Sequence, residues 1–168
     1  MPPPPERLFP TSRGVTTELW HEGQMYFLCL PTEDNSKVNI TFPTADIGKG
    51  PTAIVPLSQC KYGTISGAVE RGKNPMQELI HEAKQEYKLE LIPNQISVLE
   101  HVAPTYVLQL KGKNKYIRGH FLLTRYRIEL TLEQLNVLQE TGVACVRENV
   151  DAAQVRPELR YLFSEEKI

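Results

Sequence analysis

Acidic side chains recur at helical spacing in the middle of the chain and are the clearest candidates for chemistry. Glu78, Glu82 and Glu86 follow one another at intervals of four residues, and Gln85 stands beside the last of them. Residues four apart lie on one face of a helix, where like charges repel. A hard divalent cation, which prefers oxygen ligands, relieves that repulsion, and so do solvent and neighbouring lysines. The stripe therefore indicates either a metal site or a solvated helix face.

The surrounding residues predict a helix that is preceded by a glycine-rich turn. Asn74 has the character of an N-cap, Pro75 suits the first helical position, and Gln77 has capping-box spacing. Apolar residues then recur with helical periodicity and define a core-facing side: Met76, Leu79, Ile80, Ala83 and Tyr87. Glycines punctuate the turn, where positive φ or close backbone approach is expected: Gly63, Gly67 and Gly72.

The stretch Gly67–Leu89 resembles a degenerate Nudix box, whose pattern is Gly, five residues, Glu, seven residues, then Arg-Glu-aliphatic-any-Glu-Glu-any-Gly-aliphatic. With Gly67 as the box glycine, Lys73 takes the place of the first Glu, and His81–Leu89 takes the place of the final run. Tyr62-Gly63 also stands where the family often has Trp-Gly. The resemblance implies an α/β fold, a Nudix-type α/β/α sandwich with a mixed curved β-sheet between helices.

In the Nudix family the box carboxylates bind Mg²⁺ or Mn²⁺, and one of them can act as base. The resemblance therefore implies a metal site at Glu82 and Glu86, helped by the Gly67 carbonyl, and catalytic roles for both carboxylates. Gln85 replaces a third carboxylate with a neutral amide, which can still offer a carbonyl oxygen. The family also often has an acidic ligand or base before the last strand. Glu140 stands near that place, with Glu133 as an alternative.

Three further departures affect how the helix is braced and closed. Lys73 and His81 replace the Glu and Arg that pair in the family, so the pair is lost at both ends and neither partner is orphaned. Lys88 replaces the glycine that closes the helix.

A basic stretch follows the box. From His101 to Ile128 there are six Lys or Arg, two His and no acidic residue. Tyr116–Ile128 is the longest predicted strand, and its alternation places Arg118 and His120 on one face. Arg118, His120 and Lys73 are therefore candidates to bind substrate phosphates. The alternative is a salt-bridged or solvated sheet face.

The remaining elements fit one Nudix-like domain over 15–168, after a flexible proline-rich tail over 1–14. We expect a hairpin turning at Glu22-Gly23, with Trp20 packed rather than stacked on a base, and a strand before the box. After the basic stretch we expect a helix over Thr131–Glu140, a strand over Val143–Val146 and helical structure over Val150–Lys167.

Composition narrows the class of protein. The chain has 168 residues, 40% hydrophobic, with a formal net charge of −1, so no strongly charged partner is indicated. Cys29, Cys60 and Cys145 are isolated in the sequence, which predicts free thiols. The N-terminus lacks the apolar core of a signal peptide, and no run of 18 apolar residues exists, so we expect a cytoplasmic protein without membrane association.

Two functions remain open. The first is a metal-assisted hydrolase, of weak activity, that cleaves the pyrophosphate bond of a nucleoside diphosphate linked to another group. The second is a catalytically inactive Nudix-fold pseudoenzyme that binds a nucleotide, a nucleic acid or a protein. Gln85 favours the second, because metal affinity at an all-oxygen site depends on its charged ligands. We favour the first, with a nucleotide-like phosphorylated small molecule as substrate.

Overall fold

The computed structural model describes residues 12–29, 37–42, 53–56, 60–102, 105–110, 116–156, 159 and 161–164. The strands in these ranges are β1 (Ser12–His21), β2 (Gln24–Cys29), β3 (Lys37–Phe42), β4 (Ala53–Pro56), β5 (Tyr62–Gly63), β6 (Gly67–Ala68), β7 (Ile96–Val102), β8 (Thr105–Leu110), β9 (Tyr116–Glu129) and β10 (Ala144–Val146). The helices are α2 (Pro75–Tyr87), α3 (Leu132–Glu140) and α4 (Tyr161–Ser164), with 3₁₀ turns η2 (Pro93–Gln95), η3 (Arg147–Asn149) and η4 (Ala152–Gln154). Within the described ranges, no helix is long and apolar enough to cross a lipid bilayer.

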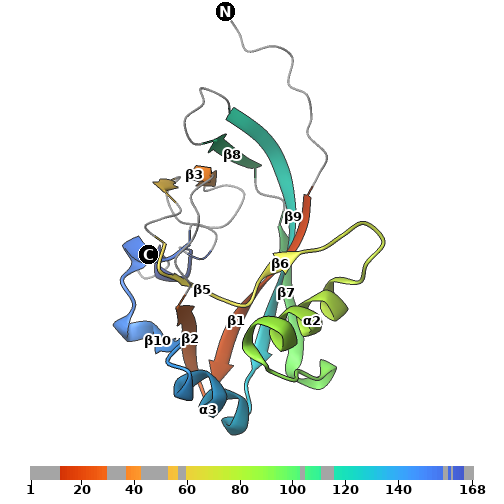
Figure 1. Ribbon diagram of the computed structural model, residues 1–168, viewed down its shortest axis with the longest axis vertical. Helices are drawn as coiled ribbons and strands as arrows, with labels where there is room; N and C mark the ends of the chain where they lie inside the picture. Colours follow the sequence, from red (N-terminus) through yellow and green to blue (C-terminus); the bar gives the residue numbers. More distant parts are fainter. Residues whose placement is uncertain are drawn as a thin grey trace, which may run out of the picture.

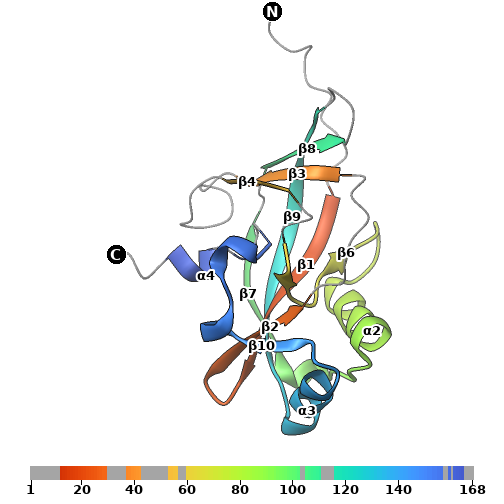
Figure 2. The ribbon, with the colours of Figure 1, turned by 60° about the vertical axis from the view of Figure 1, so that its left-hand side comes forward.

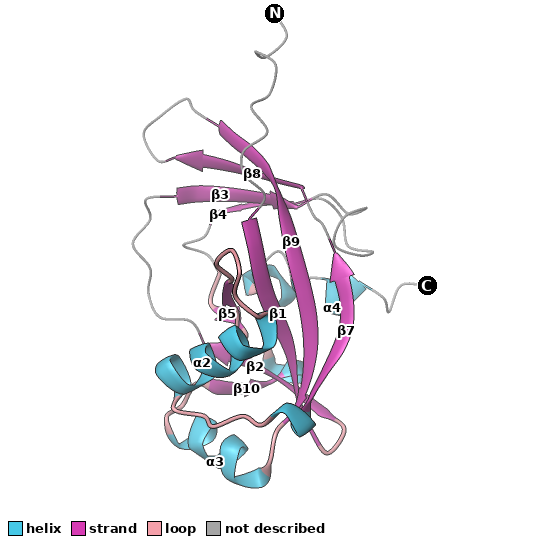
Figure 3. Ribbon diagram, turned by 90° about the vertical axis from the view of Figure 1, so that its right-hand side faces the viewer, coloured by secondary structure: helices cyan, strands magenta, loops and turns pink. Residues whose placement is uncertain are grey.

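The described strands form one mixed sheet with β9 at its centre (Figure 1). The strand order is β10-β2-β1-β9-β8-β3-β4, while β5 pairs with β2, β6 with β1 and β7 with β9. β9 is 14 residues long, and its two halves have different neighbours. Its second half runs parallel to β1 and antiparallel to β7, whereas its first half pairs with β8 at the other end of the molecule (Figure 3).

Apolar side chains cover both faces of the sheet, and each face has its own helical layer. On one face, Leu19 and Ile128 pack in a cluster with Leu79 of α2 and Leu138 of α3. On the other face, Met25 and Phe27 pack against the C-terminal segment: Val150, Val155, Leu159, Leu162 and Phe163. Figure 2 shows α2 and α4 on opposite sides of the strands. The predicted α/β class, with a mixed sheet between helices, is confirmed.

Several local predictions are also confirmed. The first hairpin turns at Glu22 and Gly23, whose φ angles of 47° and 80° suit the tight two-residue turns that match strand twist. Thr131 caps α3: its hydroxyl accepts from the Gln134 backbone N–H at 3.2 Å, and the Gln134 side chain accepts from the Thr131 N–H at 3.0 Å. The strand predicted before the box is present as β4.

Two segments differ from the sequence-based expectation. The proline-rich tail was expected to extend to residue 14, but β1 begins at Ser12, and Arg13 pairs with Leu122 of β9. The described part of Val150–Lys167 contains short turns of helix at η4 and α4 rather than a long helix. Here the backbone bonds to β5 instead, since Gln154 accepts from Lys61 N–H at 2.8 Å and the Arg156 N–H donates to Tyr62 at 3.1 Å.

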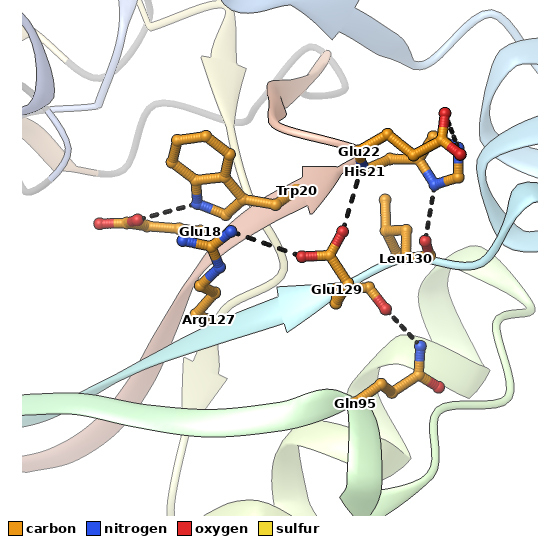
Figure 4. A network of polar contacts seen from close by, with 8 residues as sticks. All are labelled: Glu18, Trp20, His21, Glu22, Gln95, Arg127, Glu129 and Leu130. Carbon is orange, nitrogen blue, oxygen red and sulfur yellow. Dashed lines mark hydrogen bonds and ion pairs between the residues drawn. The ribbon is translucent and has the colours of Figure 1, made fainter.

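Polar contacts fasten the ends of β1 and β9 together, as Figure 4 shows. The Arg127 guanidinium lies 4.4 Å from the centroid of the Trp20 ring, and the indole N–H donates to Glu18 at 3.0 Å. His21 Nδ1 lies 2.7 Å from the carbonyl oxygen of Leu130. Trp20 also packs against the second core cluster, so its predicted packing role is confirmed.

The cysteines are free thiols, as predicted, but two of them are not isolated in space. The Sγ atoms of Cys29 on β2 and Cys145 on β10 are 3.7 Å apart, while Cys60 is buried elsewhere. Burial, followed by the neighbouring Cys145 thiol, raises the pKa of Cys29 above its ordinary value. Cys29 therefore stays protonated, and weakly nucleophilic, at neutral pH.

The C-terminus of α2 shows how the chain manages without the glycine of the box. Lys88 adopts the left-handed conformation, with φ 58° and ψ 32°. Its N–H donates to the Lys84 carbonyl, and the Leu89 N–H donates to the Ala83 carbonyl, each at 3.1 Å. These bonds satisfy carbonyls at the helix end in the way that a C-terminal glycine usually does. Leu89 is then buried in the core, which fixes the chain direction.

We predict that Lys88→Gly stabilises the protein by about 1 kcal/mol, because glycine removes the Cβ penalty of the left-handed conformation. Chemical denaturation measures the change in the free energy of unfolding. Lys84→Gly is the matched control, since Lys84 is an exposed lysine within the same helix. That substitution should destabilise by a similar amount, because glycine weakens a helix interior. Equal destabilisation by both variants would show that Lys88 carries no left-handed strain.

Candidate functional site

Glu82 and Gly67 meet, and their contact is the core of the candidate site. A Cβ atom placed on Gly67 would lie 3.0 Å from Cγ and 3.2 Å from Cδ of Glu82. These distances are shorter than ordinary van der Waals contacts, so a side chain at position 67 would displace the carboxylate. The absence of a side chain therefore lets the half-buried Glu82 carboxylate lie against the backbone of β6.

β1 holds the strand that carries Gly67 through both backbone and side-chain contacts. β6 pairs with β1 through Val15 and Gly14, and the Val69 N–H then donates to the Arg13 carbonyl at 2.9 Å. Before β6, the buried Thr17 hydroxyl lies 2.8 Å from the Ile65 carbonyl and 2.5 Å from the Thr64 hydroxyl. A buried polar group that is satisfied in this way resists movement. The Gly67 backbone is thus held in place, and the Glu82 side chain packs against it.

Helix α2 forms the other side of the candidate site. The Asn74 side chain accepts from the N–H groups of Met76 and Gln77 at 2.9 and 3.2 Å, which confirms it as the N-cap. Leu79 and Ala83 are fully buried, so the register of the helix is fixed by the core. Because Glu82 and Glu86 are four residues apart, their side chains lie on one face of this helix. Gln85 is exposed next to them.

Both carboxylates affect the pKa of Tyr87. Burial is the largest cause that raises the pKa of Tyr87 to about 12, followed by the negative charges of Glu86 and then Glu82. A phenol with a raised pKa remains neutral well beyond physiological pH. Both carboxylates therefore contribute to the raised pKa of this phenol.

The other candidate residues whose side chains the structure describes do not lie with Glu82 and Glu86. Lys73 is exposed in the turn before α2, where its N–H donates to the Glu70 carbonyl at 3.0 Å. His81 is exposed on α2, and Glu140 is exposed at the last position of α3. In the ranges that the structure describes, no three His, Cys, Asp or Glu side chains are grouped closely enough to hold a metal. α3 packs into the same core cluster as α2 through Leu135 and Leu138, while Glu140 is exposed at its C-terminal end.

The basic residues of β9 fall into two groups. The side chains of Arg118 and His120 lie outside the described residues, and their roles stay predictions; their backbones pair with Val107 and Thr105 of β8. Further along, Arg125 is buried and forms an ion pair with Glu100 of β7, and Arg127 lies over Trp20. Both of these cations have partners within the protein, since Arg127 also forms an ion pair with Glu129.

Sequence reasoning missed a cavity of about 340 Å³ beside the N-terminal end of α2. Its polar lining consists of Arg13 of β1, His101 of β7 and Thr124 of β9. The sequence signal for this cavity was weak, because Arg13 was predicted to lie in the N-terminal tail and His101 was predicted only to belong to a basic stretch. Strand pairing brings these residues together from distant parts of the chain.

The residues around Glu82 fit a divalent cation in chemical character. Glu82 and Glu86 offer carboxylate oxygens, and Gln85 and the Gly67 backbone offer neutral carbonyl oxygens. Mg²⁺ is usually bound through one or two protein carboxylates, with water and substrate phosphates as its other ligands. Two carboxylates are therefore enough in number for a magnesium site of this type.

No protein-family model matches this chain, and neither does any curated protein. Among solved structures, the C. elegans Ap4A hydrolase matches with 14% identity and a TM-score of 0.31, over 79% of this chain and 91% of that one. A mutant of the Bacillus subtilis pyrophosphohydrolase BsRppH matches with 11% identity and a TM-score of 0.33, over 88% of this chain and 69% of that one. Both likenesses are too distant to assign a function.

We predict that Gly67→Ala and Glu82→Ala are coupled. Gly67→Ala alone should destabilise the protein by about 1–2 kcal/mol, because the new methyl group overpacks against the Glu82 side chain. In a Glu82→Ala background the same change should cost less, because the clashing atoms are gone. A double-mutant cycle of chemical denaturation measures the coupling. Additive effects would show that Gly67 and Glu82 do not touch in solution.

Proposed function

We propose that this protein is a Nudix-like hydrolase that cleaves a pyrophosphate bond in a nucleoside diphosphate linked to another group. The observation that carries the proposal is the contact between Glu82 and the Gly67 backbone. The contact joins the first glycine and a carboxylate of the stretch that resembles the box, and this supports the proposal.

In this proposal Glu82 and Glu86 hold Mg²⁺ or Mn²⁺, with Gln85 and the Gly67 carbonyl as neutral donors. Such a cation, when bound, lowers the pKa of water and stabilises negative charge on phosphate oxygens. Glu82 is fixed by its contact with β6, which makes it suited to positioning. Glu86 is exposed, and in its ionised form a carboxylate that water can reach is able to accept a proton during the attack.

Phosphate-binding residues belong to the same proposal. Lys73 is exposed in the turn before α2, and we propose it, together with Arg118 and His120, as a contact for substrate phosphates. The substrate would be a nucleotide-like phosphorylated small molecule. Glu140 would take part in catalysis only if substrate binding moved the C-terminal end of α3 towards α2.

A second candidate function is a pseudoenzyme with the same fold, which binds a nucleotide, a nucleic acid or a protein without turnover. The specific observation that favours it is the neutral Gln85 beside only two carboxylates. In the described ranges no third acidic side chain completes the group. Fewer charged ligands lower the affinity of an all-oxygen site for a cation, so the site could persist as a weak one.

Two substitutions on neighbouring positions of α2 test the cation site in opposite directions. Glu86→Gln should weaken Mg²⁺ or Mn²⁺ binding about tenfold or more, a change of ~1.4 kcal/mol, because a charged ligand is lost. Gln85→Glu should strengthen binding and raise any turnover, because it adds a charged oxygen to the same face. Calorimetric titration of both cations measures these changes, and circular dichroism confirms that each variant is folded.

Turnover decides between the two functions. Phosphate release from a panel of nucleoside diphosphate derivatives, dependent on the cation and lost in Glu86→Gln, would establish the hydrolase. Cation binding without turnover of any panel member would favour the pseudoenzyme. Identical cation binding by the unmodified protein and by Glu86→Gln would contradict the site in either form.

A further inference from the structure

The cavity beside the N-terminal end of α2 is separate from the carboxylate pair. Pro75, which lines it, precedes Glu82 by seven residues on the same helix, or about 10 Å along the helix axis. The volume of about 340 Å³ is within the range of small-molecule sites, about 300–1,000 Å³. The cavity is thus large enough for a ligand of its own.

The lining combines positive and apolar character and contains no acidic side chain. Arg13 and His101 supply the nitrogen donors, and Thr124 supplies a hydroxyl. Glu100, which precedes His101, forms an ion pair with Arg125. Glu70, which follows Val69, is exposed and does not line the cavity. The remaining walls are apolar: Val69, Pro75, Val102, Leu122 and Leu123. An acidic or purely polar ligand would match only part of this surface.

Arg13 is the main reason to expect an anion. Its backbone is fixed between β9 and the Val69 N–H, and its side chain is half-buried. Among the described residues no carboxylate pairs with its guanidinium. Holding a cation partly out of water without a partner costs free energy, and a bound anion offsets that cost. The cavity provides the space for such an anion.

The orientation of His101 suits it to bind the same anion. Its Nδ1 lies 3.2 Å from the hydroxyl of the buried Thr124, and this contact fixes the plane of the ring. Nε2 then remains available to a ligand. Two nitrogen-bearing side chains on either side of a small cavity suit a tetrahedral oxyanion, whose several oxygens accept hydrogen bonds from different directions.

We propose that this cavity binds the phosphate group of a phosphomonoester, with the phosphate at Arg13 and His101 and an apolar substituent against the Leu122 side of the wall. The site is distinct from the carboxylate pair and binds without a metal. Its ligand is either a free phosphomonoester or a terminal phosphate of a substrate that extends along α2. Both sources share the same chemistry at Arg13.

Phenyl phosphate is the probe, because it joins a phosphate to an apolar ring. In metal-free buffer it should bind more tightly than inorganic phosphate, since the ring buries apolar surface. Arg13→Gln should weaken its binding about tenfold or more, because a charge-assisted hydrogen bond is lost. His101→Gln should weaken it by a smaller factor. Calorimetry gives the affinities, and thermal denaturation checks that each variant is folded.

Two controls make the outcome decisive. Arg71→Gln removes an equal charge from an exposed turn outside the cavity, and should leave binding unchanged. Glu82→Gln should also leave it unchanged. Equal losses in Arg13→Gln and Arg71→Gln would show diffuse attraction and overturn the proposal. Binding that requires Mn²⁺ and disappears in Glu82→Gln would place the phosphate at the carboxylate pair, which overturns this site while supporting the proposed hydrolase.

Competition separates the two ligand sources. If phenyl phosphate competes with turnover of a nucleoside diphosphate derivative, and Arg13→Gln abolishes that competition, the cavity receives part of the substrate. If it binds through Arg13 without affecting turnover, the cavity takes a free phosphomonoester. No detectable binding of phenyl phosphate to the unmodified protein would refute the site.

Discussion

The close approach between α2 and the backbone of β6 is the constraint on which the candidate site depends. A side chain at position 67 would force the Glu82 side chain to shift. The register of α2, which the buried Leu79 and Ala83 fix, brings Glu82 to this place. Of the candidate ligands on α2, Glu82 is half-buried, whereas Gln85 and Glu86 are exposed. The position of Glu82 is thus a consequence of how the core holds two elements against each other.

Strand β1 links this constraint to the rest of the molecule. It pairs with β6, which carries Gly67, and it runs parallel to β9, which forms the centre of the sheet. Its residues contribute to the core on one face through Val15 and Leu19, and hold Trp20 on the other. The same strand supplies Arg13 to the second cavity. β1 therefore contacts the strand that carries Gly67 and also supplies one lining residue of the cavity.

Short-range sequence signals predict much of this fold. Contacts between residues that are distant in the sequence could not be predicted from it. The caps at Asn74 and Thr131 and the turn at Gly23 follow from side-chain chemistry within a few residues. Lys88 shows that a missing glycine need not prevent a helix end, since the buried Leu89 fixes the turn. The cavity and the contact between the Cys29 and Cys145 thiols depend on strand order, which residue spacing does not reveal. The Arg125 ion pair was likewise hidden, because Glu100 lies on another strand.

The most direct test of the central claim is an Mn²⁺ titration followed by NMR, because the paramagnetic ion broadens the signals of nearby amides. If Glu82 is held against Gly67 as part of a cation site, the amide signals of Gly67 and of the α2 turn from Glu82 to Glu86 should broaden first. The same titration of Glu86→Gln should show that selective broadening only at much higher Mn²⁺. Broadening that begins at other acidic residues, such as Glu133 and Glu140, or that is uniform across the surface, would contradict the account.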